Sequence, residues 1–155
     1  PEQIEHVLSL VERMIETAQI KVTTSISPEL SHTTLPEQVI EVLLNLATNA
    51  VEALPTGGEI FITAWVEENR VNIAVKNSGP KIADEHLERI FEPFFTTKPN
   101  GTGLGLPISY NILEQLGGFL FAENLPDGVQ FTISLPVQGT SPSDPFPGSP
   151  GDEPS

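Results

Sequence analysis

The sequence predicts a mixed α/β sandwich of about three long helices and five strands. Apolar residues recur at helical spacing in three segments and alternate with polar residues in several others. The strands come in runs between the helices, which favours a sandwich over a doubly wound sheet. With 155 residues and 38% hydrophobic content, the chain can bury one real core.

The first half of the chain begins with a segment whose apolar side chains, Met14 among them, fall on one helical face. A later long helix starts at Pro36 and ends at a Pro-Thr-Gly-Gly turn. The elements predicted there are helix 1–18, strand 20–26, helix 36–54, and strands 59–66 and 71–76 joined by the hairpin 67–70.

The second half is predicted to be mostly irregular over 77–100, with a short helix near 84–90. A third long helix begins near Leu106, where apolar residues including Ile108 recur at helical spacing, and Gly117-Gly118 ends it. Strands at 119–123 and 129–135 follow. We therefore place one domain at 1–137 and a disordered acidic tail at 138–155, because the tail is built of Pro, Ser, Gly and Asp.

Composition restricts the partners of this chain. Seven Lys+Arg against 21 Asp+Glu give a net charge of −14, so we expect no nucleic-acid partner. No apolar run is long enough to span a membrane, and we expect no membrane contact by this piece. The absence of cysteine suits a reducing compartment, and we expect the cytoplasm. Because the chain starts at Pro1 without Met, we interpret it as part of something longer.

Three glycines, Gly101, Gly103 and Gly105, alternate with other residues where the third long helix begins. A helix N-terminus carries unpaired N–H groups and the positive end of the helix dipole, and glycine lets the backbone approach a phosphate. The alternative is a flexible loop that caps a structural helix. The pattern alone leaves both open.

The helix that starts at Pro36 carries a polar stripe made by Glu41, Asn45 and Asn49. Residues four apart are offset by only about 40° around a helix, so these side chains share one face. One interpretation is that both amides face water. The other is that they face a ligand or a hydrated cation, because amide oxygens are hard donors suited to Mg²⁺.

Five segments, in order, resemble the signature boxes of sensor histidine kinases. They cover about residues 38–136. They are Asn45-Leu-Ala-Thr-Asn49 (N box), Asn77-Ser-Gly79-Pro-Lys81 (first glycine box), Phe91-Glu-Pro-Phe94-Phe95 (F box), Gly101-Thr-Gly103-Leu-Gly105-Leu106 (second glycine box) and Gly128-Val-Gln-Phe131 (closing box). These kinases belong to the ATPase superfamily shared with type II topoisomerases, mismatch-repair proteins and a heat-shock chaperone.

The resemblance implies an α+β fold, a two-layer sandwich in which a mixed five-stranded sheet packs on three long helices. ATP would bind under a short lid between Phe95 and Gly101. Asn49 would be the Mg²⁺ ligand. Asn45 stands where hydrolytic members carry a water-activating Glu, and an amide is a poor base, so direct phosphoryl transfer is favoured. Glu41 is the alternative base, although a solvated role suits it better.

The resemblance also implies the nucleotide contacts. Phosphate contacts would come from the second glycine box, that is from Gly101, Thr102, Gly103, Leu104, Gly105 and Leu106. Lys98, the one cation close to that loop in sequence, would stabilise charge on the transferred group, or is simply an exposed lysine. The F-box aromatics would anchor the lid, or are ordinary core. Asn77 and Gly79 would hold the base.

Three positions depart from the family pattern. Asn77 replaces the Asp that accepts a hydrogen bond from the adenine amino group, so the bond loses its charge assistance. Lys81 replaces a glycine. Val129 replaces a Thr that helps to hold a water bound to adenine. We therefore expect weaker selectivity for adenine over guanine than is usual in the family.

A histidine kinase phosphorylates a His on a dimerising segment, and His6, His32 and His86 lack the expected neighbours. We therefore expect the phosphoacceptor in an upstream dimerisation segment of the parent chain and a response regulator as the next acceptor. Three alternatives stay open: an anti-sigma-factor-type serine kinase of the same superfamily, a nucleotide-binding pseudokinase, and an unrelated structural domain.

Overall fold

A single mixed sheet organises the fold in the computed structural model, which describes residues 2–30, 33–87, 89–92 and 105–136. The strand order is β1-β2-β3-β5-β4, with β1 parallel to β2 and the other neighbours antiparallel. The strands are β1 Ile20–Ile26, β2 Gly58–Glu67, β3 Arg70–Asn77, β4 Phe119–Leu125 and β5 Gly128–Pro136. The predicted mixed five-stranded sheet is confirmed, with strand ends displaced by one or two residues.

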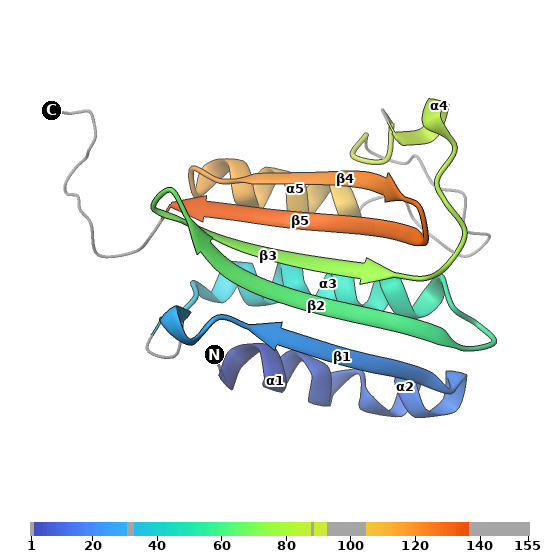
Figure 1. Ribbon diagram of the computed structural model, residues 1–155. Helices are drawn as coiled ribbons and strands as arrows, with labels where there is room; N and C mark the ends of the chain where they lie inside the picture. The colour runs from blue at the N-terminus through green and yellow to red at the C-terminus, as the bar shows by residue number, and fades with distance from the viewer. Residues whose placement is uncertain (1, 31–32, 88, 93–104, 137–155) are drawn as a thin grey trace, which may run out of the picture.

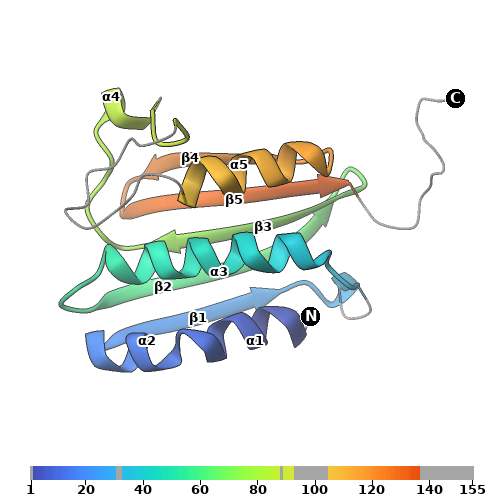
Figure 2. The same ribbon diagram turned by 180° about the vertical axis from the view of Figure 1, so that it is seen from behind.

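Helices α1, α2, α3 and α5 lie on one face of this sheet, so the molecule is the expected two-layer sandwich (Figures 1 and 2). The helical segments are α1 Glu2–Leu10, α2 Glu12–Ala18, the 3-10 turn η1 Pro28–Leu30, α3 Glu37–Glu52, α4 Asp84–Leu87 and α5 Gly105–Gln115. Within the part of the chain that the structure describes, no helix is long and apolar enough to cross a bilayer.

The prediction of one continuous helix over 1–18 is wrong, because the structure divides this segment into α1 and α2. Val11 adopts φ −108° and ψ 8°, outside the helical region, although its carbonyl still accepts the Ile15 N–H at 3.0 Å. The break lets α1 pack on α3 while α2 packs on β1. Val11 is buried, whereas Met14, predicted on the apolar face, is exposed.

A side chain of α1 ties the helix to the segment that precedes α3. Gln3 Oε1 accepts the Leu35 N–H at 2.8 Å, and Gln3 Nε2 donates to the Leu35 carbonyl at 3.0 Å. The two bonds satisfy both backbone polar groups of a buried leucine that lies outside regular structure.

The central helix α3 buries more of its circumference than a single apolar stripe would. Val39, Val42 and Leu46 are almost fully buried, whereas Ile40 and Leu44 are only partly buried. The reason is that α3 packs on the sheet through β3, on α1 and on α5. The solvent side is left to polar residues.

Two turns follow their sequence signals. Glu68 and Asn69 both have positive φ, 54° and 62°, as a tight hairpin between β2 and β3 requires. Gly117, at φ 78°, ends α5, and the Gly118 N–H bonds the Leu113 carbonyl at 2.8 Å. One apolar prediction in α5 is wrong, because Ile108 is 53% exposed.

Candidate functional site

One end of the sandwich gathers the segments that carry the motifs. The carboxyl end of α3, the first turn of α5, the end of β3 and the turn between β4 and β5 all lie there (Figure 2). α3 contacts both β3 and α5, so residues far apart in sequence meet at this end.

The amide of Asn45 contacts the beginning of α5. Asn45 Nδ2 donates to Ser109 Oγ at 3.1 Å, and Ser109 is buried. Gly105 is the first residue of α5, and a Cβ added to it would lie 2.9 Å from Asn45 Oδ1. A Cβ at this position would force the Asn45 amide to shift, so glycine permits this close approach. The structure thus brings together Asn45 and Gly105, which are sixty positions apart in the sequence.

The polar stripe of α3 is not a simple solvent face. Asn45 and Asn49 are both half-buried, and Asn45 is bonded to α5. The interpretation that both amides face water is therefore wrong for Asn45. Glu41, one turn earlier, is exposed, in agreement with a solvated residue.

Asn77 is the last residue of β3 and lies on the helix-covered face of the sheet. Its side chain is buried, with 4% exposure, and its Oδ1 accepts the Gly79 N–H at 2.8 Å. Gly79 is packed closely, because a Cβ there would lie 2.9 Å from both the Ala53 carbonyl oxygen and Asn77 Oδ1. Asn77, predicted to begin an irregular segment, is therefore a sheet residue with a local turn after it.

Two closing-box residues border Asn77 in the sheet. Val129 is its direct partner on β5 and is buried. A Cβ at Gly128 would collide with the Asn77 carbonyl, so glycine is required for β5 to close on the end of β3. The two positions at which the sequence departs from the adenine-reading pattern, Asn77 and Val129, are thus neighbours in space.

A side chain that no sequence motif marks holds the loop after Asn77. Asn124 on β4 accepts the Ile82 N–H at its Oδ1 (2.9 Å) and donates from Nδ2 to the Ile82 carbonyl (2.7 Å). The amide pairs with Ile82 as a neighbouring strand would. No sequence signal marks this contact, because the residues are 42 positions apart and an isolated Asn in a strand is unremarkable.

Residues 34–139 match the family described as "Histidine kinase-, DNA gyrase B-, and HSP90-like ATPase". This match covers more than half of the chain. The chain belongs to this ATPase family.

Within the family, the chain is similar to sensor histidine kinases. It is 43% identical over 143 residues to the sensor histidine kinase ZraS of Klebsiella oxytoca, covering 89% of this chain and 30% of ZraS. It is 41% identical over 105 residues to sporulation kinase E of Bacillus subtilis, covering 66% of this chain and 14% of that kinase. The chain therefore spans less than a third of the length of either relative.

The fold matches a solved histidine kinase domain. The catalytic domain of the histidine kinase ThkA, in a nucleotide-free form, superposes with a TM-score of 0.80 at 38% identity, covering 88% of this chain and 92% of that domain. The expected sensor histidine kinase catalytic fold is thereby confirmed.

Of the two F-box residues that the structure describes, Phe91 packs against the core and Glu92 is exposed. Ile90, just before the box, is buried, and the rings of Phe91 and Tyr110 on α5 lie with centroids 5.2 Å apart. The negative charge of Glu114 raises the pKa of Tyr110 above its ordinary value. Phe91 therefore joins the turn after α4 to α5, whereas Phe94 and Phe95 lie outside the described residues.

Other predicted site residues also fall outside the described residues: Lys98, Gly101, Thr102, Gly103 and Leu104, with His32 and the tail 138–155. Gly105 and Leu106 are the described members of the second glycine box. Leu106 is partly buried and packs against the core.

The turn between β4 and β5 is fixed to β3 by charge. Lys76 Nζ lies 2.7 Å from Asp127 Oδ1. The hydrogen bond from Lys76, with a smaller charge effect of Lys81, holds the pKa of Asp127 below its ordinary value. Lys81, which replaces a glycine of the family pattern, is exposed and close enough to Asp127 to affect it.

The side chains of the described residues could hold Mg²⁺ only together with a nucleotide whose phosphates supply the other ligands. Among these residues no group of three or more His, Cys, Asp or Glu could hold a metal by itself. The N box offers amide oxygens, which suit Mg²⁺ as single ligands when phosphates supply the rest. The first turn of α5, which begins at Gly105, carries the unpaired backbone N–H groups that suit a phosphate.

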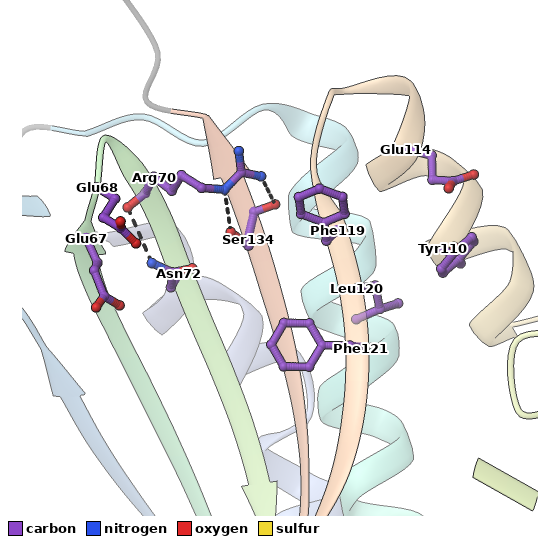
Figure 3. A pocket seen from close by; sticks show the side chains of 10 residues that line it. All are labelled: Glu67, Glu68, Arg70, Asn72, Tyr110, Glu114, Phe119, Leu120, Phe121 and Ser134. Carbon is purple, nitrogen blue, oxygen red and sulfur yellow. Dashed lines mark hydrogen bonds between the residues drawn. The ribbon is translucent and has the colours of Figure 1, made fainter. Parts of the chain in front are cut away.

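A hollow of about 440 Å³ lies at the other end of the sheet and is not this site (Figure 3). There Arg70 donates from Nε to Ser134 Oγ at 2.7 Å, and its guanidinium lies 5.0 Å from the centroid of the Phe119 ring. Arg70 begins β3 and Asn77 ends it, so the length of a strand separates the hollow from the motif residues.

Proposed function

We propose that this histidine kinase domain binds Mg-ATP where Asn45 meets the first turn of α5. We further propose that the longer kinase uses this site to transfer the γ-phosphoryl group to a histidine on a separate dimerisation segment. The observation that carries the proposal is the approach of Gly105 to the Asn45 amide, which is so close that a Cβ at Gly105 would displace the amide. Family membership supports the binding of ATP.

The triphosphate would lie against the N-terminal turn of α5. The backbone N–H groups there lack helical partners and the dipole favours an anion, so the turn suits phosphate oxygens. We assign these contacts to Gly105 and Leu106, continued by Gly101, Thr102, Gly103 and Leu104 of the same box. In a chain of net charge −14, such local donors are needed to hold an anion.

Asn49 would supply the protein ligand for the Mg²⁺ that accompanies the triphosphate. It is half-buried on α3, one helical turn beyond Asn45. The Mg²⁺ held there would supply positive charge to offset the charge that develops on the transferred group. A single amide ligand agrees with the lack of any carboxylate or histidine cluster among the described residues.

Asn45 would orient the reacting groups without activating water. Its amide is fixed by Ser109, and an amide cannot accept a proton near neutral pH. The site therefore favours transfer to a protein histidine over hydrolysis. Lys98 would add positive charge near the transferred group.

The partners follow from the kinase class. The phosphoacceptor would lie on a dimerisation segment of the parent chain, and a response regulator would receive the phosphoryl group next. ThkA, a relative of similar fold, has been solved in complex with the response regulator TrrA. Use of Mg-ATP and of a response regulator would place the domain in the cytoplasm.

Calorimetric titration with Mg-ATP tests the site. We expect the wild-type protein to bind Mg-ATP, and excess EDTA to weaken its affinity for ATP at least tenfold. In Asn49→Ala we expect the affinity for ATP to be the same with and without Mg²⁺. Asn111→Ala is the matched control, because Asn111 is an exposed asparagine of α5. Affinity of Asn49→Ala equal to that of wild type, with or without Mg²⁺, would reject the assignment.

Transfer is tested by adding labelled ATP and a separately made dimerisation segment of the parent kinase. We expect label on a histidine of that segment, which acid removes and alkali does not. Binding of ATP without any transfer would instead indicate a nucleotide-binding pseudokinase.

A further inference from the structure

The amide of Asn77 is buried with only one of its two ends bonded. Oδ1 accepts the Gly79 N–H at 2.8 Å, and the residue is 4% exposed. Among the described residues, no acceptor is bonded to the amide nitrogen, Nδ2. Buried polar groups are nearly always bonded, so a donor left without a protein partner at a candidate ligand site indicates a bond to the ligand.

The Gly79 N–H fixes which end of this amide is available. Rotating the amide by 180° would place Nδ2 against that N–H, so that two donors would face each other. The backbone at Gly79 has little room to move away, because it is packed against the Ala53 carbonyl. The loop is also held further on, where Asn124 bonds both backbone groups of Ile82.

The side chains directly across from Asn77 on the two neighbouring strands offer Nδ2 no acceptor. Asn77 is paired with Ile60 on β2 and with Val129 on β5, and both of these side chains are buried hydrocarbon. The end of β3 therefore presents one amide NH₂ group in an apolar frame. A carboxylate at the same position would present an acceptor instead.

We propose that Asn77 makes this site prefer a purine with an oxygen at C6, such as guanine or hypoxanthine, over adenine. This inference rests on the proposed nucleotide site and names its base. Adenine carries an NH₂ group at C6, and two NH₂ groups cannot bond to each other. A C6 carbonyl accepts the Asn77 NH₂ while Gly79 keeps its own bond to Oδ1.

The expected preference is at least tenfold. The buried Nδ2 donor makes no hydrogen bond when adenine is bound and makes one when a C6 carbonyl is bound. The loss of one such bond changes the dissociation constant by about this factor. Val129 adds no bond to either base, because its side chain is apolar. The discrimination at C6 therefore depends on Asn77.

The test is calorimetric titration of the chain with the Mg²⁺ complexes of ATP, GTP and ITP. ITP carries a C6 oxygen but lacks the 2-amino group of guanine, so it isolates the contact at C6. We expect ITP and GTP to bind at least tenfold more tightly than ATP. In Asn77→Asp we expect the order to reverse, because a carboxylate accepts from both Gly79 and the adenine amino group.

Asn72→Asp is the matched control, since Asn72 is also on β3 but on the opposite face from Asn77. It should leave the order of the three nucleotides unchanged. Tighter binding of ATP than of ITP by wild type would overturn the inference while leaving the proposed function intact. The same holds for an unchanged order in Asn77→Asp. No binding of any of the three triphosphates would reject the nucleotide site, and the inference with it.

Should Asn77→Asp fail to fold, the comparison of ITP with ATP in the wild-type chain decides alone. Thermal unfolding of wild type with each nucleotide at one concentration gives a second readout. The larger rise in midpoint is expected with ITP.

Discussion

Substituting Gly105 by alanine separates the stability of α5 from the geometry of the site. Gly105 does not have a left-handed φ, so alanine can adopt its backbone conformation. Alanine in place of glycine, where the backbone conformation allows it, stabilises a protein by about 0.4–1 kcal/mol. The new Cβ, 2.9 Å from Asn45 Oδ1 and 3.3 Å from Nδ2, forces the amide to move.

Moving the amide breaks its hydrogen bond to Ser109, which is worth about 1 kcal/mol. The gain and the loss nearly cancel, so we expect the free energy of unfolding to change by less than about 1 kcal/mol. Affinity for Mg-ATP should nevertheless fall about tenfold, or about 1.4 kcal/mol, because Asn45 no longer holds its position. Urea unfolding measures the first quantity and calorimetric titration the second.

A double-mutant cycle with Asn45→Ala isolates the contact. Once the amide is removed, the Cβ at position 105 meets no Asn45 oxygen, and Gly105→Ala should then stabilise the protein without further loss of affinity. We expect a coupling energy of at least about 0.5 kcal/mol in the unfolding data. Unchanged affinity of the single Gly105→Ala variant, together with an additive cycle, would refute the idea that this approach builds the site.

Three further outcomes are expected. Leu113→Ala should lower the free energy of unfolding by about 2–5 kcal/mol in urea, because the side chain has 0% exposure. Asn45→Glu should raise phosphate release from ATP by supplying a water-activating base, and no rise in a coupled phosphate assay would count against that role for position 45. Because Lys76 lowers the pKa of Asp127, the pair stabilises the fold above the ordinary Asp pKa and ceases to do so as the pH falls through the lowered value. The thermal midpoints of wild type and Asp127→Asn should therefore converge below about pH 4.

The fold class and the order of the elements could be predicted from local patterns, because both helical and strand periodicities were strong. The break at Val11 could not, because the apolar spacing continues through it and only the separate packing of α1 on α3 and α2 on β1 requires it. Ile108 fits the helical period but falls on the open side of α5. Periodicity shows that a helix has an apolar side, and the neighbours decide how wide that side is.

The site was predictable where a motif marked it and not where a single side chain supports it. Asn45 and Gly105 came from boxes that a sequence reader can find. Ser109 and Asn124 carry no such mark, because their roles depend on partners 64 and 42 positions away. The orientation of the Asn77 amide could not be predicted either, since only the Gly79 N–H decides which end is left for a base.

The pair of bonds between Gln3 and Leu35 has a mechanical consequence. A force applied to α1 is transmitted directly to Leu35, the residue before Pro36, through the two hydrogen bonds of Gln3. Leu35 lies just before α3. α3 is continuous from Glu37 to Glu52, so a shift of its first turn is carried as a rigid lever to the amides near its far end. Displacement of the N-terminal helix would therefore act on the end of α3 that lies opposite to Asn49.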